Sequence, residues 1–398
     1  MTIEEISNIK TGVLFDVYSR FDLTLTQSKG VHVFDIEGYK YLDMYGGHGV
    51  ISIGHSQPYY TGMVRDQLTS LGYYSNSVHI PLQQELATKL ARVSGYPTHQ
   101  LFLCNSGAEA NENALKLASF HTGKNKIIAF KGSFHGRTSA ALNVTDNIHL
   151  SAPINQNNFE VEFVELNDVD QLKNAFAGND VCAVIVEGIQ GVGGLDAPTK
   201  AFLQLISDQC NKHGALLILD EIQSGYGRTG QFFAHQYCNV QADIISMAKG
   251  MGNGFPIAGI LIHPTIQSKH GLLGTTFGGN HLACAAGIAV LDVMDEEQLL
   301  KNVLQVSEYL IKELSVVSQI KKIKGRGLMM GLEFDFPIAE LRVQLLNEYR
   351  IITGGSANPN LLRILPPLCI STEEVDVFVR AIKDIFNQRN NIKHTSLH

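Results

Sequence analysis

Short, almost wholly apolar segments alternate with helical segments from about residue 80 onward, and this alternation constrains the fold more than any other feature. Residues 83–93 and 200–213 show the periodicity of amphipathic helices. The apolar runs are 101–104, 127–130, 181–186, 215–219, 244–247 and 257–262. Strands that are apolar on both faces are typical of a mostly parallel sheet covered by helices. We therefore predict a large, doubly wound α/β domain.

A hairpin before this region and a second alternation after it complete the predicted organisation. Residues 31–43 place two alternating runs around Glu37-Gly38, which predicts a β-hairpin. The C-terminal elements are expected as helices at 297–315, 337–349 and 372–387 and as strands at 328–334 and 361–365. A chain of 398 residues is long enough for more than one domain. The predicted units are an N-terminal segment whose helix and hairpin pack with the small domain (1–50), the large domain (51–290) and a small α+β domain (291–390).

Charge and cysteine usage exclude several classes of function. The net charge is −7 and Lys and Arg form no cluster, which argues against a dedicated nucleic-acid binder. The six cysteines include no C-x-x-C pair, a pattern typical of reduced thiols in the cytosol. Glu4 and Glu5 stand where a signal peptide would be basic, and no apolar run reaches membrane-spanning length. We expect a cytoplasmic protein without a membrane partner, and we assign no metal site.

A phosphate-binding segment follows the first apolar run, where an open α/β sheet places its ligands. Ser106 and Glu109 have the spacing of a capping box, which predicts the start of a helix. Gly107 and Ala108 are small enough for backbone N–H groups to approach a phosphate, and the helix dipole favours that charge. Taken alone, this segment is better interpreted as a well-capped helix.

Three further strands end in ionisable residues. Glu187 and Asp220 each close a buried strand, and Lys249 leads from a third strand into the glycine-rich run 250–254. A buried acid is costly unless a cation faces it, although a helix cap or an internal ion pair would also explain one. Lysine at a strand end is often a solvated surface charge. Together, a phosphate cradle, an acid beside a pyridine nitrogen and an imine-forming lysine are what pyridoxal phosphate requires.

Five segments closely resemble the class III aminotransferases, and the acetylornithine/ornithine aminotransferase group is the best match. The resemblance runs from roughly residue 10 to 385 with the motifs in family order. The segments are 105–111, 134–138, 220–230, 248–250 and 274–280. The resemblance implies the fold of type I pyridoxal-phosphate enzymes and a homodimer with active sites at the subunit interface.

The resemblance also implies a role for each residue that binds pyridoxal 5'-phosphate. Gly107 and Ala108 hold the phosphate, and Phe134 stacks on the pyridine ring. Asp220 pairs with the ring nitrogen, and Lys249 forms the imine and moves the proton. The implied cofactor-binding residues are Ser106, Gly107, Ala108, Phe134, Glu187, Asp220, Gln223 (near the ring hydroxyl), Lys249 and Thr276 (from the partner subunit).

Substrate binding is implied for three residues. Arg137 clamps a substrate carboxylate, Thr275 lies near the substrate, and Arg363 takes the α-carboxylate of 2-oxoglutarate. The resemblance favours N-acetylornithine as amino donor, hence a role in arginine biosynthesis, with N-succinylornithine and free ornithine as alternatives. A class III aminomutase is a remoter alternative, because it needs no second arginine. A cofactor-free binding protein is disfavoured by the intact Lys249 and Asp220.

The chain departs from the family pattern at three positions. Gly188 replaces a proline and Val192 replaces a second glutamate, which in the family masks the second arginine while the donor is bound. Either Arg363 is therefore uncovered here, or another acid such as Glu187 or a water covers it, and the identity of the donor stays open. His48 stands where an aliphatic residue is expected, and we interpret it as a hydrogen-bonded structural histidine.

Overall fold

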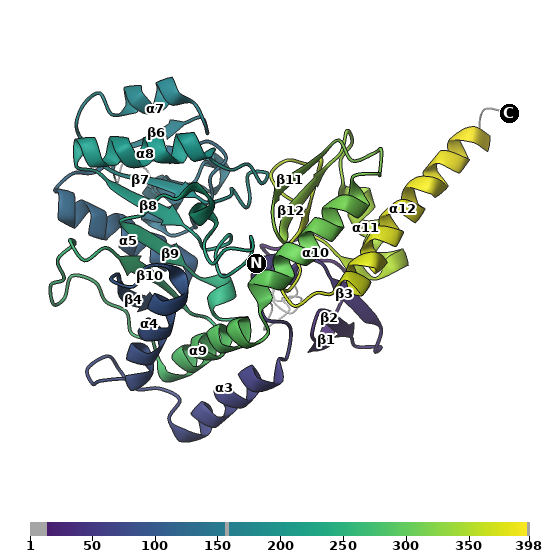
Figure 1. Cartoon of the computed structure of the whole chain (residues 1–398), viewed down its shortest axis with the longest axis horizontal. Helices are drawn as coiled ribbons and strands as arrows, with labels where there is room; N and C mark the ends of the chain where they lie inside the picture. The colour runs from purple at the N-terminus through teal and green to yellow at the C-terminus, as the bar shows by residue number, and fades with distance from the viewer. Residues whose placement is uncertain (1–13, 156–158, 396–398) are drawn as a thin grey trace, which may run out of the picture.

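A seven-stranded sheet forms the centre of the larger part of the molecule in this computed structural model, which describes residues 14–155 and 159–395 (Figure 1). The strands, in spatial order, are β4 (Gln100–Cys104), β10 (Ala258–Ile262), β9 (Ile244–Met247), β8 (Leu216–Asp220), β7 (Val181–Glu187), β5 (Lys126–Phe130) and β6 (Val161–Val164). β10 is antiparallel to both neighbours, and the other pairs are parallel. The predicted mostly parallel sheet is confirmed, and the six apolar runs supply six of its strands. The seventh, β6, was not predicted, because it lies at the edge and is only half-buried.

Helices cover both faces of this sheet, which explains why its central strands are apolar throughout. Ile185 and Ile218 pack in one cluster with α5 (Gly107–Thr122). Their neighbours Val184 and Leu217 belong to the cluster on the other face, with α8 (Lys200–His213). Because successive side chains in a strand point to opposite faces, both sets are buried.

The remaining helices of this part surround the sheet edges and follow the connections (Figure 1). They are α3 (Pro58–Ser70), α4 (Pro81–Ser94), α6 (Ser139–Asn143), α7 (Val169–Ala175) and α9 (His281–Glu296). The sequence did not predict α9, because most of its residues are buried and it lacks the polar face of an amphipathic helix. Among the described residues, no helix is both long and apolar enough to cross a membrane.

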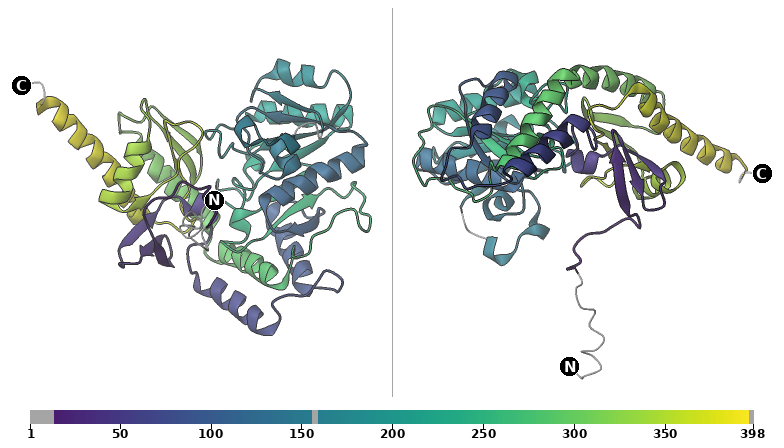
Figure 2. Two further views of the ribbon diagram at one scale, coloured as in Figure 1. Left: turned by 180° about the vertical axis from the view of Figure 1, so that it is seen from behind. Right: turned by 90° about the horizontal axis from the view of Figure 1, so that it is seen from below.

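The C-terminal part forms a second body beside the first (Figures 1 and 2). Its three antiparallel strands are β11 (Lys322–Arg326), β12 (Met329–Glu333) and β14 (Leu361–Ile364). Its helices are α10 (Leu299–Leu314), α11 (Ala339–Tyr349) and α12 (Thr372–Thr395). The predicted helix at 372–387 therefore continues by eight residues, to Thr395. Figure 2 shows the end of α12 projecting from this body.

The N-terminal segment joins the C-terminal part through a second sheet. The predicted hairpin is present as β2 (His32–Asp35) and β3 (Lys40–Asp43), with β1 (Leu25–Lys29) added at the edge. β13 (Ile351–Ile352) pairs with β3 and links this sheet to the C-terminal part. The helix expected in this segment is not found at residues 14–24, and residues 1–13 lie outside the described residues. The exact domain limits remain predictions.

Candidate active site

One cavity of about 640 Å³ brings together most of the predicted site residues. It lies at the carboxyl ends of the parallel strands β7, β8 and β9, and residues of the N-terminal segment and of β14 complete its wall. The predicted residues that line it are Ser106, Gly107, Ala108, Phe134, Arg137, Glu187, Asp220, Gln223, Lys249 and Arg363. His48 and Val192, the two unusual replacements, line it as well.

Lys249 occupies the turn that follows β9, with a left-handed φ of 47°. Burial lowers the pKa of its amine, and the carboxyl groups of Asp220 and Glu187 oppose that shift. Within the described part of the chain, no hydrogen bond or ion pair involves its Nζ, although the residue lines the cavity. A buried lysine amine with a lowered pKa and no hydrogen-bond partner is suited to act as a nucleophile.

Contacts across about 200 residues fix this lysine turn. Ser52 Oγ donates to the Gly250 carbonyl at 2.8 Å. The Asn253 side chain accepts from the Ser52 and Ile53 amides at 2.8 and 3.1 Å and donates to the Gly54 carbonyl at 2.9 Å. Residues 52–54 therefore hold the backbone that carries Lys249.

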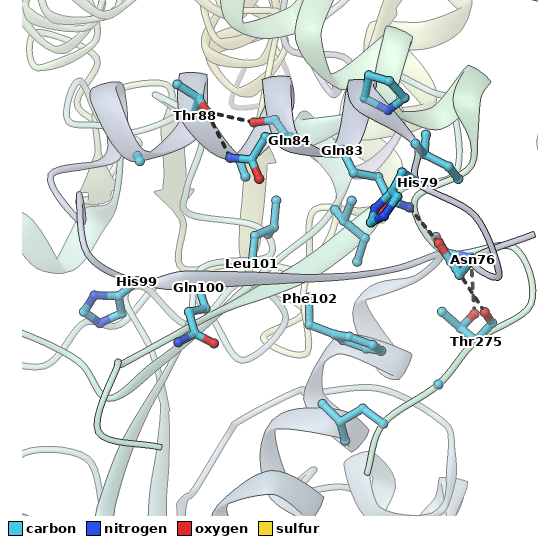
Figure 3. Close-up of a pocket in the computed structure, with 18 of the residues that line it drawn as sticks. Asn76, His79, Gln83, Gln84, Thr88, His99, Gln100, Leu101, Phe102 and Thr275 are labelled. Carbon is cyan, nitrogen blue, oxygen red and sulfur yellow. Dashed lines mark hydrogen bonds between the residues drawn. The ribbon is translucent and has the colours of Figure 1, made fainter. Parts of the chain in front are cut away.

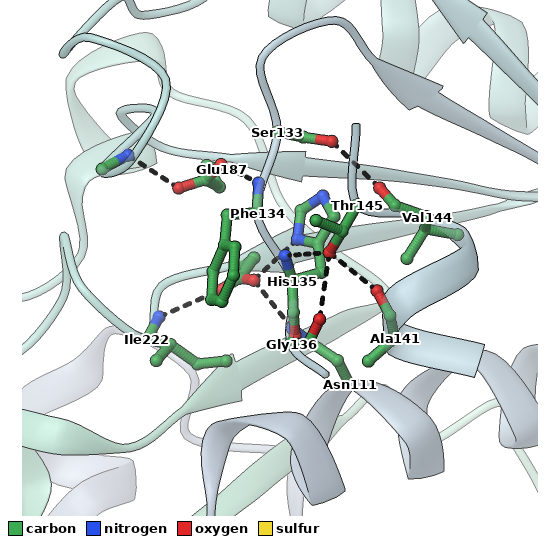
Figure 4. A network of polar contacts seen from close by, with 12 residues as sticks. Asn111, Ser133, Phe134, His135, Gly136, Ala141, Val144, Thr145, Glu187 and Ile222 are labelled. Atoms are coloured by element: carbon green, nitrogen blue, oxygen red, sulfur yellow. Dashed lines mark hydrogen bonds and ion pairs between the residues drawn. The ribbon is translucent and has the colours of Figure 1, made fainter. Parts of the chain in front are cut away.

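Asp220, the last residue of β8, is held by three donors (Figure 4). Its Oδ2 accepts from His135 Nδ1 and from Asn111 Nδ2, both at 2.8 Å, and its Oδ1 accepts from the Ile222 amide at 3.0 Å. The carboxylate is buried and its orientation is fixed. His135 and Asn111 were not predicted as site residues, although both lie inside the segments that carry the resemblance.

Glu187, at the end of β7, shapes the wall beside Phe134 (Figure 4). Its two carboxyl oxygens accept from the Phe134 amide at 3.0 Å and from the Gly191 amide at 2.8 Å. Burial raises the pKa of Glu187 to about 7, and the nearby Asp220 carboxylate adds to the shift. Glu187 therefore fixes two loops.

The N-terminus of α5 forms the other end of the cavity. Ser106 Oγ accepts from the Glu109 amide at 3.2 Å, and the Glu109 carboxylate accepts from the Asn105 amide at 2.7 Å. A Cβ at Gly107 would come within 2.9 Å of the Ile222 side chain, so this position has no room for a larger residue. Among the described residues, the amides of Gly107 and Ala108 have no hydrogen-bond acceptor, as an anion site requires.

Arg363, in β14, is buried and bound only by neutral oxygens. Its guanidinium donates to the carbonyls of Gly355 and Gly191 and, at 2.7 Å, to the Tyr45 hydroxyl. Among the described residues, no carboxylate lies within 4.0 Å of it, since the oxygens of Glu187 face backbone amides instead. The charge of Arg363 is therefore not neutralised by an ion pair. Val192, which stands where the family pattern has a glutamate, has no charge with which to neutralise it.

Thr275 and Thr276 are the two predicted residues that this cavity does not include. Thr275 Oγ1 accepts from Asn105 Nδ2 at 3.1 Å, and the Thr276 carbonyl accepts from Tyr73 at 3.3 Å. Thr275 instead borders a separate cavity of about 1070 Å³ between α4 and β4, which Figure 3 shows to be lined by polar side chains such as Gln83 and Gln100.

The residues of the first cavity fit pyridoxal phosphate. Uncovered amides at the start of α5 suit the phosphate, and the unpaired amine of Lys249 suits the aldehyde. Asp220 is fixed by its hydrogen bonds at the cavity wall, and Phe134 lines the same cavity. The roles of the individual residues stay predictions.

Comparison with known proteins assigns the chain to a family. The model of the class-III aminotransferase family matches residues 16–386, and the chain belongs to this family of enzymes. The acetylornithine aminotransferases of Methanosarcina acetivorans and Bacillus subtilis are each 37% identical to it, over 93% of this chain and 93% and 96% of their own lengths. The ornithine aminotransferase of Toxoplasma gondii ME49 superposes with a TM-score of 0.86, at 26% identity, over 96% of this chain and 94% of its own.

Proposed function

We propose that the protein moves the side-chain amino group of an N-acylated ornithine to 2-oxoglutarate, giving a semialdehyde and glutamate. N-acetylornithine is the proposed donor, which places the enzyme in arginine biosynthesis. The observation that carries this proposal is the unpaired Lys249 amine in one cavity with two arginines, Arg137 and Arg363. The names of the curated relatives support the choice of donor.

The cofactor proposed is pyridoxal 5'-phosphate, which when bound holds the amino group in transit and draws electrons from the carbon that carries it. In this proposal the amides of Gly107 and Ala108 bind the phosphate. Asp220 keeps the proton on the ring nitrogen, and its three hydrogen bonds hold it in place for that role. Lys249 takes the proton from one carbon and returns it to another.

Two guanidinium groups in one cavity suit an acceptor with two carboxylates. Arg137 lies on the exposed side of the cavity, and Arg363 lies buried in its wall. 2-Oxoglutarate would span the two, with its α-carboxylate on Arg363. An aminomutase needs only one such contact, so this pair favours a transaminase.

We further propose that the enzyme is a cytoplasmic homodimer. Thr276 does not line the cavity of its own chain, which agrees with its serving the phosphate of a partner. Nearby side chains, Tyr73, Tyr74 and Phe277, are apolar and exposed in the single chain, as an interface would leave them. All six cysteines are free, as expected in the cytoplasm. Light scattering of the purified holoenzyme should give twice the chain mass; a monomer would contradict the shared site.

Half-reaction spectroscopy tests the proposed activity. Holoenzyme is mixed with N-acetylornithine, N-succinylornithine or ornithine, and the cofactor absorbance is followed as its aldehyde form becomes the amine form. N-acetylornithine should convert it with the highest second-order rate constant, and 2-oxoglutarate should restore it. Faster conversion by another derivative would reassign the donor, and no conversion by any of them would refute the proposal.

A further inference from the structure

His48 adopts a backbone conformation that does not require a histidine. The four residues of the short element α2 (Gly46–Gly49) have φ values of 54°, 55°, 71° and 72°, so they form a left-handed turn. Glycine adopts this conformation freely, whereas a residue with a Cβ is strained there. His48 is the only one of the four with a side chain. Since glycine would fit this backbone conformation better, we infer that the imidazole has a role other than stabilising the turn.

The turn is held firmly and presents the imidazole at the cavity. Asp43 Oδ1 accepts from the amides of Tyr45 and Gly46 at 2.9 and 2.8 Å. The His48 ring lies 4.8 Å from the Tyr45 ring, whose hydroxyl in turn binds Arg363. His48 is exposed where it lines the cavity, and within the described residues no hydrogen bond involves its ring. This corrects the interpretation of His48 as a hydrogen-bonded structural histidine.

Positive charge surrounds the ring. Burial and the cations of Arg363, Lys249, Arg342 and Arg137 lower the pKa of His48, which favours the neutral form of its imidazole. The two carboxyl groups of the cavity wall are already bound to other donors. A neutral imidazole offers one N–H donor and one acceptor nitrogen. The same positive field disfavours an ammonium group placed beside the ring.

We propose that His48 is a specificity-determining residue, which binds the N-acyl amide of the donor and favours N-acylated ornithine over free ornithine. The inference rests on the function proposed above. An amide supplies both an N–H and a carbonyl oxygen, which match the two ring nitrogens of His48. His48, Arg137 and Lys249 line the same cavity, so a donor with its side-chain amine at Lys249 and its α-carboxylate at Arg137 would bring its α-nitrogen within reach of the imidazole. A free α-ammonium would meet cations there, and acylation removes its charge.

Two variants separate the imidazole from the turn. His48→Gly relaxes the backbone and deletes the ring, while His48→Asn keeps a polar group and tolerates the left-handed conformation. Gln298→Gly is the matched control, since Gln298 has a φ of 52° and lies outside the cavity. Each holoenzyme is assayed in the donor half-reaction with N-acetylornithine and with ornithine. Calorimetry with N-acetylnorvaline, which lacks the reacting amine, measures binding without turnover.

The expected result for His48→Gly is a loss of tenfold or more in the ratio of the rate constants for N-acetylornithine and ornithine. The dissociation constant of N-acetylnorvaline should rise by a similar factor. His48→Asn should keep part of the preference, and Gln298→Gly should keep all of it. A ratio that changes by less than twofold in His48→Gly, with N-acetylnorvaline binding intact, would overturn the role of His48. If wild-type enzyme converts no ornithine derivative, the proposed function fails instead, and the calorimetry still reports on His48.

Discussion

Val192→Glu restores an acid beside Arg363 and should weaken the binding of 2-oxoglutarate. The carbonyl of Gly191 already accepts from the Arg363 guanidinium, so the next side chain is placed to reach it. Two opposite charges about 4 Å apart attract by about 4 kcal/mol at an effective dielectric constant near 20. Val192 is only half-buried, and ordering of the new side chain opposes the contact, so about 1–3 kcal/mol remains.

The acceptor must break this ion pair before its α-carboxylate can bind Arg363. The Michaelis constant for 2-oxoglutarate should therefore rise by about 5- to 100-fold, since every 1.4 kcal/mol is a factor of about ten. N-succinylornithine, whose acyl arm carries a carboxylate, should be penalised more than N-acetylornithine. Steady-state kinetics with all three compounds provides the assay.

Val192→Gln is the matched control, because it has the size of glutamate without the charge. It should change the three constants far less than Val192→Glu does. Unchanged constants in Val192→Glu would show that Arg363 is already neutralised or does not bind the acceptor. Equal increases in both variants would assign the effect to size rather than to charge.

Three further changes test the cofactor site. Lys249→Ala should abolish turnover but leave a folded protein that holds pyridoxal phosphate without a covalent bond, and borohydride reduction of wild-type holoenzyme should label Lys249; label on another lysine would contradict the assignment. Asp220→Asn should keep the cofactor bound but slow proton abstraction in single-turnover experiments by roughly a hundredfold or more, because an amide cannot keep the ring nitrogen protonated; a near-normal rate would make Asp220 purely structural. Burial raises the pKa of Glu187 to about 7, so the folded apoprotein holds the Glu187 proton more tightly than the unfolded chain does. The free energy of unfolding should therefore fall by about 1–3 kcal/mol as the pH rises from 4.5 to 7. Glu187→Gln should flatten this part of the curve in urea unfolding at pH 5 and pH 8, and an unaltered slope would place the titration elsewhere.

Periodicity and motif order predicted the large domain well because its central strands are buried on both faces. A short, wholly apolar run such as 181–186 is typical of a strand that is buried on both faces. α9 escaped prediction for the opposite reason, since a helix buried almost all round shows no amphipathic period. β6, at the sheet edge, contains Glu162 and is too short and mixed to stand out.

The sequence predicted which residues meet in the cavity, but not how they bind one another. The ends of parallel strands share one edge, so Glu187, Asp220 and Lys249 were expected together. The neutral partners of Arg363 come from distant loops, and no local pattern announces contacts of that kind. His48 was misread for a related reason, because its left-handed φ becomes visible only in three dimensions.

The hydrogen bonds between residues 52–54 and the Asn253 side chain have a consequence for the folding of the chain during its synthesis. These partners are separated by about 200 residues, so residues 52–54 leave the ribosome long before the amide that binds them exists. Contacts at such separation form late, after the intervening sheet has assembled. We therefore expect the turn bearing Lys249 to become rigid late in folding, after residues 52–54 and Asn253 have met within the large domain.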